Sequence, residues 1–452
     1  MIEVSSLPMF DELNSKNTNF ERSKKLQQVS HQLIPGGAHT YAKGDDQYPE
    51  LAPGFIVRGE GCHVWDVDGN EYIEYGMGLR AVTLGHGYRR VADAAYRALL
   101  NGTNFTRPGL IEVEAAEEFL SIANGADMVK FTKDGSSVTS AALKLARAYT
   151  GRDMVGICIN HPFFSYDDWF IGTTPMTAGI PKAVRDLSVT FEYNNLASVQ
   201  ALFDQYPGQI ACLILEPVKD EDPIDNFLHE TMRICHENGA LFILDEMITG
   251  LRLDLGGGQK YYDIVPDLST WGKALGNGIA ISALAGKREI MELGGINHDR
   301  ERVFLLSTTH GAETHALAAA IETIHVYKEE PVVEHMARAG TLLANGLNAV
   351  IDQAGVQGYV KVVGKPSNLV FATLDQDKKG SQVYRALLMQ ELIKRGILGP
   401  SLVVSYAHSD EDIKHTIAAF GEALSVYHKA LEDGAEKYLV GRPVKPVFRK
   451  YC

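Results

Sequence analysis

One lysine is the only basic residue in a run rich in glycine and small residues, which has Asp267 near its start. The run is PDLSTWGKALGNG, residues 266–278, and its lysine is Lys273. An ammonium group is costly to bury without a partner, so such a lysine is either a solvated loop residue or a nucleophilic amine held near a carbonyl group.

Earlier in the chain the strand-like segment LFILDEM contains Asp245. Because ligands of open α/β sheets bind at the carboxyl ends of strands, Asp245 is a candidate functional acid, although a turn or cap residue is the alternative.

A second group of residues could bind a phosphate. Gly135, Ser136 and Ser137 come directly before a segment rich in alanine and leucine that has helical character. The first turn of a helix exposes backbone N–H groups and the positive end of the helix dipole, and both attract an anion. The alternative is that a serine only caps the helix.

Within the segment INHPFFSYDDWFIG, the seven residues 163–169 include four aromatic ones: Phe163, Phe164, Tyr166 and Trp169. One of them could stack on a planar ring, and the alternative is packing in the core. A phosphate cradle, an aromatic plate, a strand-end carboxylate and a solitary lysine are together what pyridoxal 5′-phosphate requires. In such sites the lysine forms a Schiff base with the cofactor and the aspartate keeps the pyridine nitrogen protonated.

A parallel sheet would bring these side chains together. The strand-like segments ACLILEPV and ALFILDEM flank NFLHETMRICHENG, in which Leu228, Met232 and Cys235 share one helical face. Strand, helix and strand at this spacing predict a right-handed βαβ unit. Nearer the N-terminus, WDVDGNEYI has a turn sequence between alternating apolar residues and predicts a β-hairpin.

These patterns predict an α/β protein with three segments. Residues 1–84 form an N-terminal arm and part of a small domain, and residues 85–330 form a large cofactor-binding domain with a mostly parallel sheet. Residues 331–452 complete the small α+β domain and end in a basic tail. The large domain should therefore carry the chemistry.

Most of the chain, from about residue 30 to 425, resembles the class III aminotransferases of fold type I. Within them it is most similar to the glutamate-1-semialdehyde 2,1-aminomutase-like branch. The blocks GCHVWDVDGNEYIEY, LARAYTGRD, ILDEMITGLR, PDLSTWGKALGNG and SYAHSDEDI occur in family order and carry the resemblance.

The resemblance implies a role for each candidate cofactor residue. Lys273 would be the catalytic lysine that carries the internal aldimine, and Asp245 would be its catalytic partner at the pyridine nitrogen. Gly135 and Ser136, with the neighbouring Ser137, would hold the phosphate, and Phe163 would stack on the ring.

The resemblance also implies a homodimer with its active sites at the subunit interface. The segment LLSTTHGAE is similar to the one whose threonine reaches the phosphate of the neighbouring subunit. Thr309 would take that role, with Thr308 as the alternative.

Departures from the family pattern concern the substrate. The family's aminomutases bind the substrate carboxylate with an arginine in the N-terminal loop, whereas GGAHTYAKG has His39 near that place. Phe164 follows the stacking aromatic where the family has a histidine, and Arg80 in GMGLRAVTLGH offers a different cation. We therefore expect amino transfer to or from a small polar carbonyl or amine substrate. An intramolecular aminomutase is the alternative, and a non-catalytic binding protein of this fold is a more distant one.

The composition of the chain limits its possible partners and its compartment. The chain has 57 acidic and 43 basic residues and a net charge of −14, which argues against nucleic acid as a partner. Its five cysteines are scattered without a CxxC pair, so we expect reduced thiols of a cytoplasmic protein and no metal site. The first 16 residues lack the features of a signal peptide, and no apolar run has the length of a membrane span.

Overall fold

The structure is a computed structural model that describes residues 19–161 and 163–451. The segment without signal-peptide features and Cys452 therefore lie outside the described residues, as does the first part of the predicted arm. The described chain forms two compact units. The larger unit consists of Arg80–Thr83, Tyr88–His335 and the residues from Phe448 onward. The smaller unit consists of the described residues up to Leu79, Leu84–Gly87 and Met336–Val447.

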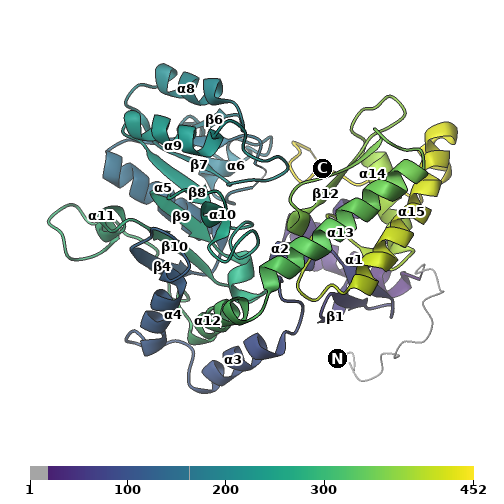
Figure 1. The fold of residues 1–452 in the computed structure, drawn as a ribbon, viewed down its shortest axis with the longest axis horizontal. Helices are drawn as coiled ribbons and strands as arrows, with labels where there is room; N and C mark the ends of the chain where they lie inside the picture. Colours follow the sequence, from purple (N-terminus) through teal and green to yellow (C-terminus); the bar gives the residue numbers. More distant parts are fainter. Residues whose placement is uncertain (1–18, 162, 452) are drawn as a thin grey trace. The chain divides into compact units, whose positions relative to one another are not determined.

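A seven-stranded sheet in the order β4-β10-β9-β8-β7-β5-β6 forms the centre of the larger unit (Figure 1). Its strands are β4 (Met128–Thr132), β5 (Met154–Cys158), β6 (Ser188–Phe191), β7 (Ile210–Leu215), β8 (Leu241–Asp245), β9 (Leu268–Trp271) and β10 (Ser282–Gly286). Strands β5 to β9 are parallel, and β10 is antiparallel to both of its neighbours. The predicted α/β fold with a mostly parallel sheet is confirmed.

Helices cover both faces of this sheet because its central strands are apolar on both sides. In β8, Leu241 and Ile243 belong to the core cluster under helix α5 (Gly135–Thr150). Phe242 and Leu244 point the other way, into the cluster under α8 (Leu196–Gln205) and α9 (Phe227–Glu237). Alternating side chains of one strand thus fill two separate cores, as expected for a buried parallel sheet.

The larger unit has further helices outside these layers (Figure 1). They are α3 (Arg89–Leu100), α4 (Leu110–Leu120), α6 (Asp168–Ile171), α7 (Lys182–Arg185), α10 (Gly257–Tyr261), α11 (Arg288–Met291) and α12 (Thr314–Glu329). Among them, α3 packs on α12. Among the described residues, no helix is both long and apolar enough to span a bilayer.

The smaller unit combines segments from both ends of the chain, purple and yellow in Figure 1. Its four-stranded sheet has the order β1-β2-β3-β13, and a separate pair joins β11 to β12. The strands are β1 (Ile56–Glu60), β2 (His63–Asp66), β3 (Glu71–Glu74), β11 (Val360–Val363), β12 (Val370–Thr373) and β13 (Ile397–Leu398). Its helices are α1 (Glu21–Leu33), most of α13 (Val332–Gln353), α14 (Gln382–Ile393) and α15 (Asp410–Asp433). The antiparallel pairing of β2 with β3 confirms the predicted hairpin.

The C-terminal tail differs from the predicted segments. The prediction placed the whole of 331–452 with the small domain, whereas the residues from Phe448 onward group with the larger unit. The reason is aromatic packing, because the Phe448 ring contacts Phe163 and Phe170 with centroid separations of 6.5 and 6.2 Å.

Candidate active site

Lys273 follows strand β9 after one residue, Gly272, and begins a 3₁₀ turn over Lys273–Gly276. Its backbone has a φ of +42°, in the left-handed region that residues with a Cβ seldom occupy. The turn packs tightly, because a Cβ on the preceding Gly272 would lie 2.5 Å from Ser282 Oγ and 2.8 Å from Met247 Sδ. Such strain persists only where the surrounding structure enforces it, and it is concentrated at functional sites.

Asp245 is the last residue of the neighbouring strand β8 and is 2% exposed. Its Oδ1 accepts hydrogen bonds from Thr270 Oγ1 at 2.9 Å and from the Met247 N–H at 3.0 Å. Both bonds end on Oδ1, so they fix the carboxylate through that oxygen. Burial raises the pKa of the Asp245 carboxyl to about 6, and the charge of Lys273 opposes that rise.

Lys273 and Asp245 therefore act on each other electrostatically, as the sequence analysis expects of partners in one site. Burial lowers the pKa of the Lys273 ammonium, while Asp245 and Glu216 oppose the shift. A lowered pKa increases the fraction of neutral amine, which is the nucleophilic form.

Glu216 is a third member of this charge cluster that the sequence analysis did not name. It follows strand β7 directly and is 2% exposed. Burial and the neighbouring Asp245 raise its pKa, while Lys273, Lys219 and Arg80 lower it. The signal was present, because Glu216 follows a predicted apolar strand in the same way that Asp245 ends one.

His161 was also missed, and it contacts the same strand end. Its Nδ1 accepts a hydrogen bond from the Glu216 N–H at 2.9 Å. Among the described residues, His161 Nε2 and Glu216 Oε2 are buried atoms without a hydrogen-bond partner. Buried polar atoms are nearly always paired in folded proteins, so two unpaired ones at one place indicate a ligand-binding site.

The first turn of α5 approaches this cluster. A Cβ on Gly135 would lie 2.9 Å from Sδ of Met247, the residue that also bonds Asp245. The cap of the helix is Asp134, not a serine, and its carboxylate accepts the Ser137 N–H at 2.9 Å and the Ser137 hydroxyl at 3.0 Å. Ser137 is thus already bonded, whereas the N–H groups of Gly135 and Ser136 have no acceptor within the helix. Ser136 Oγ accepts the Tyr166 N–H at 3.0 Å and so holds the aromatic segment against the helix.

The aromatic segment places its two phenylalanines differently. Phe164 is 2% exposed and packs in the core under α5, with its carbonyl accepting from Thr139 Oγ1 at 3.0 Å. Phe163 is 50% exposed and lies with its ring nearly parallel to Phe448, at an angle of 17°. Phe163 is thus the ring of the two that remains free for a further contact.

Arg80 ends an unusual backbone turn, Met77–Arg80, in which all four φ angles are positive. Outside glycine, the left-handed conformation costs about 1–2 kcal/mol per residue. The turn is held at Arg80, whose carbonyl accepts a hydrogen bond from Nη2 of the buried Arg252 at 2.9 Å. Burial lowers the pKa of the Arg80 guanidinium, whereas Glu216 and Asp220 raise it, so Arg80 belongs to the same charge cluster.

The remaining predicted site residues are exposed, and one of them belongs to the smaller unit. His39 is exposed between two 3₁₀ turns of the smaller unit, Pro35–Gly37 and Tyr41–Lys43. Thr308 and Thr309 are exposed on the loop before α12, where the Thr309 carbonyl accepts from Asn104 Nδ2 at 2.9 Å.

Comparisons with known proteins identify the family of the chain. Residues 44–424 match the family described as aminotransferase class-III. The chain belongs to the class III aminotransferases. It is 32% identical over 420 residues to glutamate-1-semialdehyde 2,1-aminomutase 1 of Lachnoclostridium phytofermentans, a match that covers 88% of this chain and 97% of the relative.

The fold of this aminotransferase is similar to solved structures over most of its length. The internal aldimine form of the FumI protein of Sphingopyxis sp. MTA144, which holds pyridoxal phosphate, is 28% identical with a TM-score of 0.83, over 91% of this chain and 98% of the other. An omega-transaminase from Sphaerobacter thermophilus is 25% identical with a TM-score of 0.80, over 89% and 97%. The enzyme has fold type I and depends on pyridoxal phosphate.

The residues of this aminotransferase fit that cofactor. A half-buried amine with a lowered pKa suits an aldehyde, and a buried carboxylate with both hydrogen bonds on one oxygen suits a ring nitrogen. Backbone N–H groups at the start of α5 suit a phosphate. The unpaired buried atoms of His161 and Glu216 show that the polar groups of the site are not satisfied by the protein alone.

Proposed function

We propose that the chain transfers an amino group between small molecules and that Lys273 is its catalytic residue. Pyridoxal phosphate, when bound, supplies an electron sink that makes a substrate C–H bond acidic. Lys273 would hold the cofactor through its amine, and its freed Nζ would then take up and return the proton. The observation that supports this is a half-buried lysine with a left-handed backbone whose charge interacts with those of Asp245 and Glu216.

The other cofactor residues follow from their surroundings. Asp245 Oδ2 would bind the protonated pyridine nitrogen, and the N–H groups of Gly135 and Ser136 would bind the phosphate, with Ser137 fixing the helix start. Phe163 would cover one face of the ring, since its side chain is half exposed beside Phe448.

We also propose a homodimer in which Thr309 of one subunit donates to the phosphate bound by the other. Thr309 is exposed in the single chain, which a contact with a second subunit would explain. A twofold axis makes the sharing reciprocal, so two equivalent sites form together. We expect the enzyme to act in the cytoplasm, where the four unbridged cysteines among the described residues stay reduced.

The proposed substrate is a small polar carbonyl compound or amine. Arg80 would bind its anionic or hydroxylated part, and the unpaired polar atoms of His161 and Glu216 favour a substrate with hydrogen-bonding groups. His39 stands near the place of the arginine that binds the carboxylate in the family's aminomutases and cannot form the same bidentate contact. Glutamate 1-semialdehyde is therefore not the proposed substrate.

The first experiment replaces the lysine. Lys273→Ala should bind the cofactor without the visible absorption band of a lysine-bound form, and its turnover should fall by at least about 100-fold. Lys260→Ala, at an exposed position on α10, is the control and should keep both band and turnover. Near-normal turnover of Lys273→Ala would contradict the proposal.

The second experiment tests the substrate class. Single amines are mixed with the loaded enzyme, loss of the absorption band is followed, and the carbonyl product is identified. Arg80→Ala should slow the reaction of the best amine donor by at least about 30-fold, which corresponds to the loss of a charge contact of about 2 kcal/mol. Arg80→Lys should restore part of that rate. Rapid conversion of glutamate 1-semialdehyde to its isomer, unaffected by Arg80→Ala, would contradict this assignment.

An intramolecular aminomutase is the second candidate, because a relative at 32% identity carries that name. It differs in stoichiometry, since one substrate is isomerised and no separate carbonyl product accumulates. The donor screen therefore separates the two: a released carbonyl product supports the transaminase, and its absence with an isomerised amine supports the mutase.

A further inference from the structure

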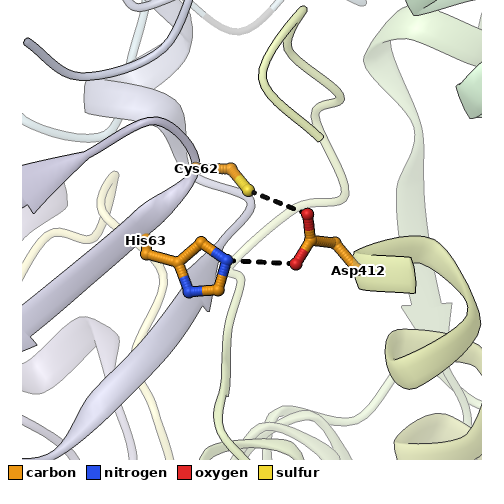
Figure 2. Close-up of side chains that lie close together, drawn as sticks. All are labelled: Cys62, His63 and Asp412. Atoms are coloured by element: carbon orange, nitrogen blue, oxygen red, sulfur yellow. Dashed lines mark hydrogen bonds and ion pairs between the residues drawn. The ribbon is translucent and has the colours of Figure 1, made fainter. Parts of the chain in front are cut away.

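A cluster of metal-binding side chains lies in the smaller unit, among residues that amino transfer does not use. Cys62 directly precedes strand β2, His63 begins it, and Asp412 lies in the first turn of helix α15 (Figure 2). One ligand atom from each of the three side chains lies within 4.8 Å of the other two. The cluster therefore joins segments that are about 350 residues apart in sequence.

The thiol and the imidazole converge on one carboxylate. Cys62 Sγ lies 3.5 Å from Asp412 Oδ2, and His63 Nε2 lies 3.0 Å from Asp412 Oδ1. Figure 2 shows both side chains pointing at the two oxygens of the same group. Ligand atoms of a tetrahedral zinc site are about 3.4 Å apart, given metal–ligand bonds of about 2.0–2.3 Å. The two separations, which run to different oxygens of Asp412, are both near that value, and the three ligand atoms lie within 4.8 Å of one another.

The second nitrogen of the histidine is already held as metal sites hold it. His63 Nδ1 lies 2.6 Å from Glu71 Oε1, on the adjacent strand β3. In metal centres a carboxylate commonly binds the non-ligating nitrogen of a ligand histidine, which fixes the ring and leaves Nε2 for the metal. Glu71 is thus a positioning residue, and Nε2 is the nitrogen that faces the thiol and the carboxylate.

The cluster also has a route to solvent. Cys62 is 1% exposed, but the side chains of His63 and Asp412 are 33% and 14% exposed. An ion can therefore enter from the His63 side, where a water molecule can complete the coordination. A sulfur, nitrogen and oxygen donor set with an open position suits zinc better than magnesium or calcium, which prefer oxygen ligands.

We propose that Cys62, His63 and Asp412 bind a zinc-type divalent metal ion, with Glu71 positioning His63. Binding would displace the hydrogens that now lie on Cys62 Sγ and His63 Nε2, which would leave as protons to solvent. The ion would tie the start of α15 to the β2–β3 hairpin, a role separate from amino transfer. The spacing of the cysteines did not indicate this site, because the proposed ligands include a single cysteine. Asp412 is also about 350 residues away from the other two ligands in the sequence.

The test uses Co²⁺, whose bond to a thiolate gives a charge-transfer absorption. The protein is the loaded enzyme carrying Cys452→Ser, treated with a chelator, so that a C-terminal thiol cannot bind the ion. We expect one Co²⁺ per chain with a thiolate band in the difference spectrum, and displacement of the band by Zn²⁺. Absence of a thiolate band at saturating Co²⁺ would overturn the proposal.

Variants then assign the ligands. Cys62→Ser should abolish the thiolate band and weaken Zn²⁺ binding at least about 10-fold, and Glu71→Gln should keep the band while weakening binding about 10–100-fold. The control is His31→Gln, which alters another histidine–carboxylate pair of this unit, with Asp45, and should change neither. The far-ultraviolet circular dichroism and the cofactor band verify that each variant is folded. A thiolate band that survives Cys62→Ser would place the ion elsewhere and refute the assignment.

Discussion

At the scale of single residues, the site holds charges where an apolar side chain would be more stable. Asp245 is buried among apolar strands, and two hydrogen bonds to Oδ1 do not fully compensate for the loss of water, since the pKa of the carboxyl rises to about 6. A protonated pyridine nitrogen bound beside the carboxylate would act in the opposite direction and lower this pKa, because a nearby positive charge favours the ionised form.

This gives a prediction for Asp245→Asn in the protein stripped of cofactor. An acid with a pKa raised on folding binds its proton more tightly in the folded state, so stability falls as pH rises from 3.8 to about 6. Asparagine imitates the protonated form at every pH. The variant should therefore be more stable than the unmodified chain by about 3 kcal/mol near neutral pH, and the difference should vanish toward about pH 4.

Urea unfolding at several pH values measures that difference. The same variant should lose most of its turnover when loaded, because the ring nitrogen then lacks its anionic partner. A difference that stays constant with pH would show that Asp245 does not titrate in this range.

At the scale of elements, the alternation and spacing of apolar residues predicted those strands and helices that the local sequence determines. The strands at 210–215 and 241–245, the helix between them and the β2–β3 hairpin are found where the sequence placed them. Their signals are local, because each depends on apolar periodicity or turn residues within one segment.

What the sequence did not predict depends on contacts between distant segments. The left-handed turn at Met77–Arg80 is stabilised by Arg252, and the packing of Phe448 on Phe163 joins residues far apart in the chain. The charge cluster with Glu216 likewise requires the order of strands in the sheet. No window of neighbouring residues contains this information, and a family pattern supplies only the positions that its motifs share.

One element prediction concerns the long helix α13 in the smaller unit. A Cβ on Gly340 would lie 1.9 Å from the Pro366 carbonyl oxygen, and backbone cannot move away as a flexible side chain can. Gly340→Ala should therefore destabilise the protein by at least about 1–3 kcal/mol, despite the better helix propensity of alanine.

Gly421→Ala in helix α15 is the matched control. A Cβ there would meet Val350 at 3.4 Å, an ordinary contact, so the helix gain of up to about 1 kcal/mol should remain. The two midpoints of urea unfolding should move in opposite directions. A Gly340→Ala protein as stable as the original would mean that α13 can shift away from the 3₁₀ turn at Pro366–Asn368.

At the scale of the whole molecule, the proposed site would be complete only in the proposed dimer. Lys273, Asp245 and the start of α5 come from one chain, whereas the loop with Thr309 would serve the other subunit. Removing the Thr309 hydroxyl should weaken cofactor binding about 10-fold, the effect of one hydrogen bond to a charged group. A weakened site alone does not tell which subunit supplies the threonine.

A mixed dimer decides that question. One subunit carries Lys273→Ala and the other carries Thr309→Ala, and each has a different tag so that only the mixed species is purified. If Thr309 acts across the interface, the site that keeps Lys273 receives an intact threonine from its partner. That site should bind the cofactor with unreduced affinity, and the dimer should show about half of the original activity. If the threonine acts within its own subunit, the site that keeps Lys273 lacks the hydroxyl, and its affinity for the cofactor stays low. A mixed dimer that carries Thr308→Ala in place of Thr309→Ala tests the neighbouring hydroxyl. In the dimer with Thr309→Ala, a cofactor affinity that remains about 10-fold low at the site with Lys273 would refute the shared site.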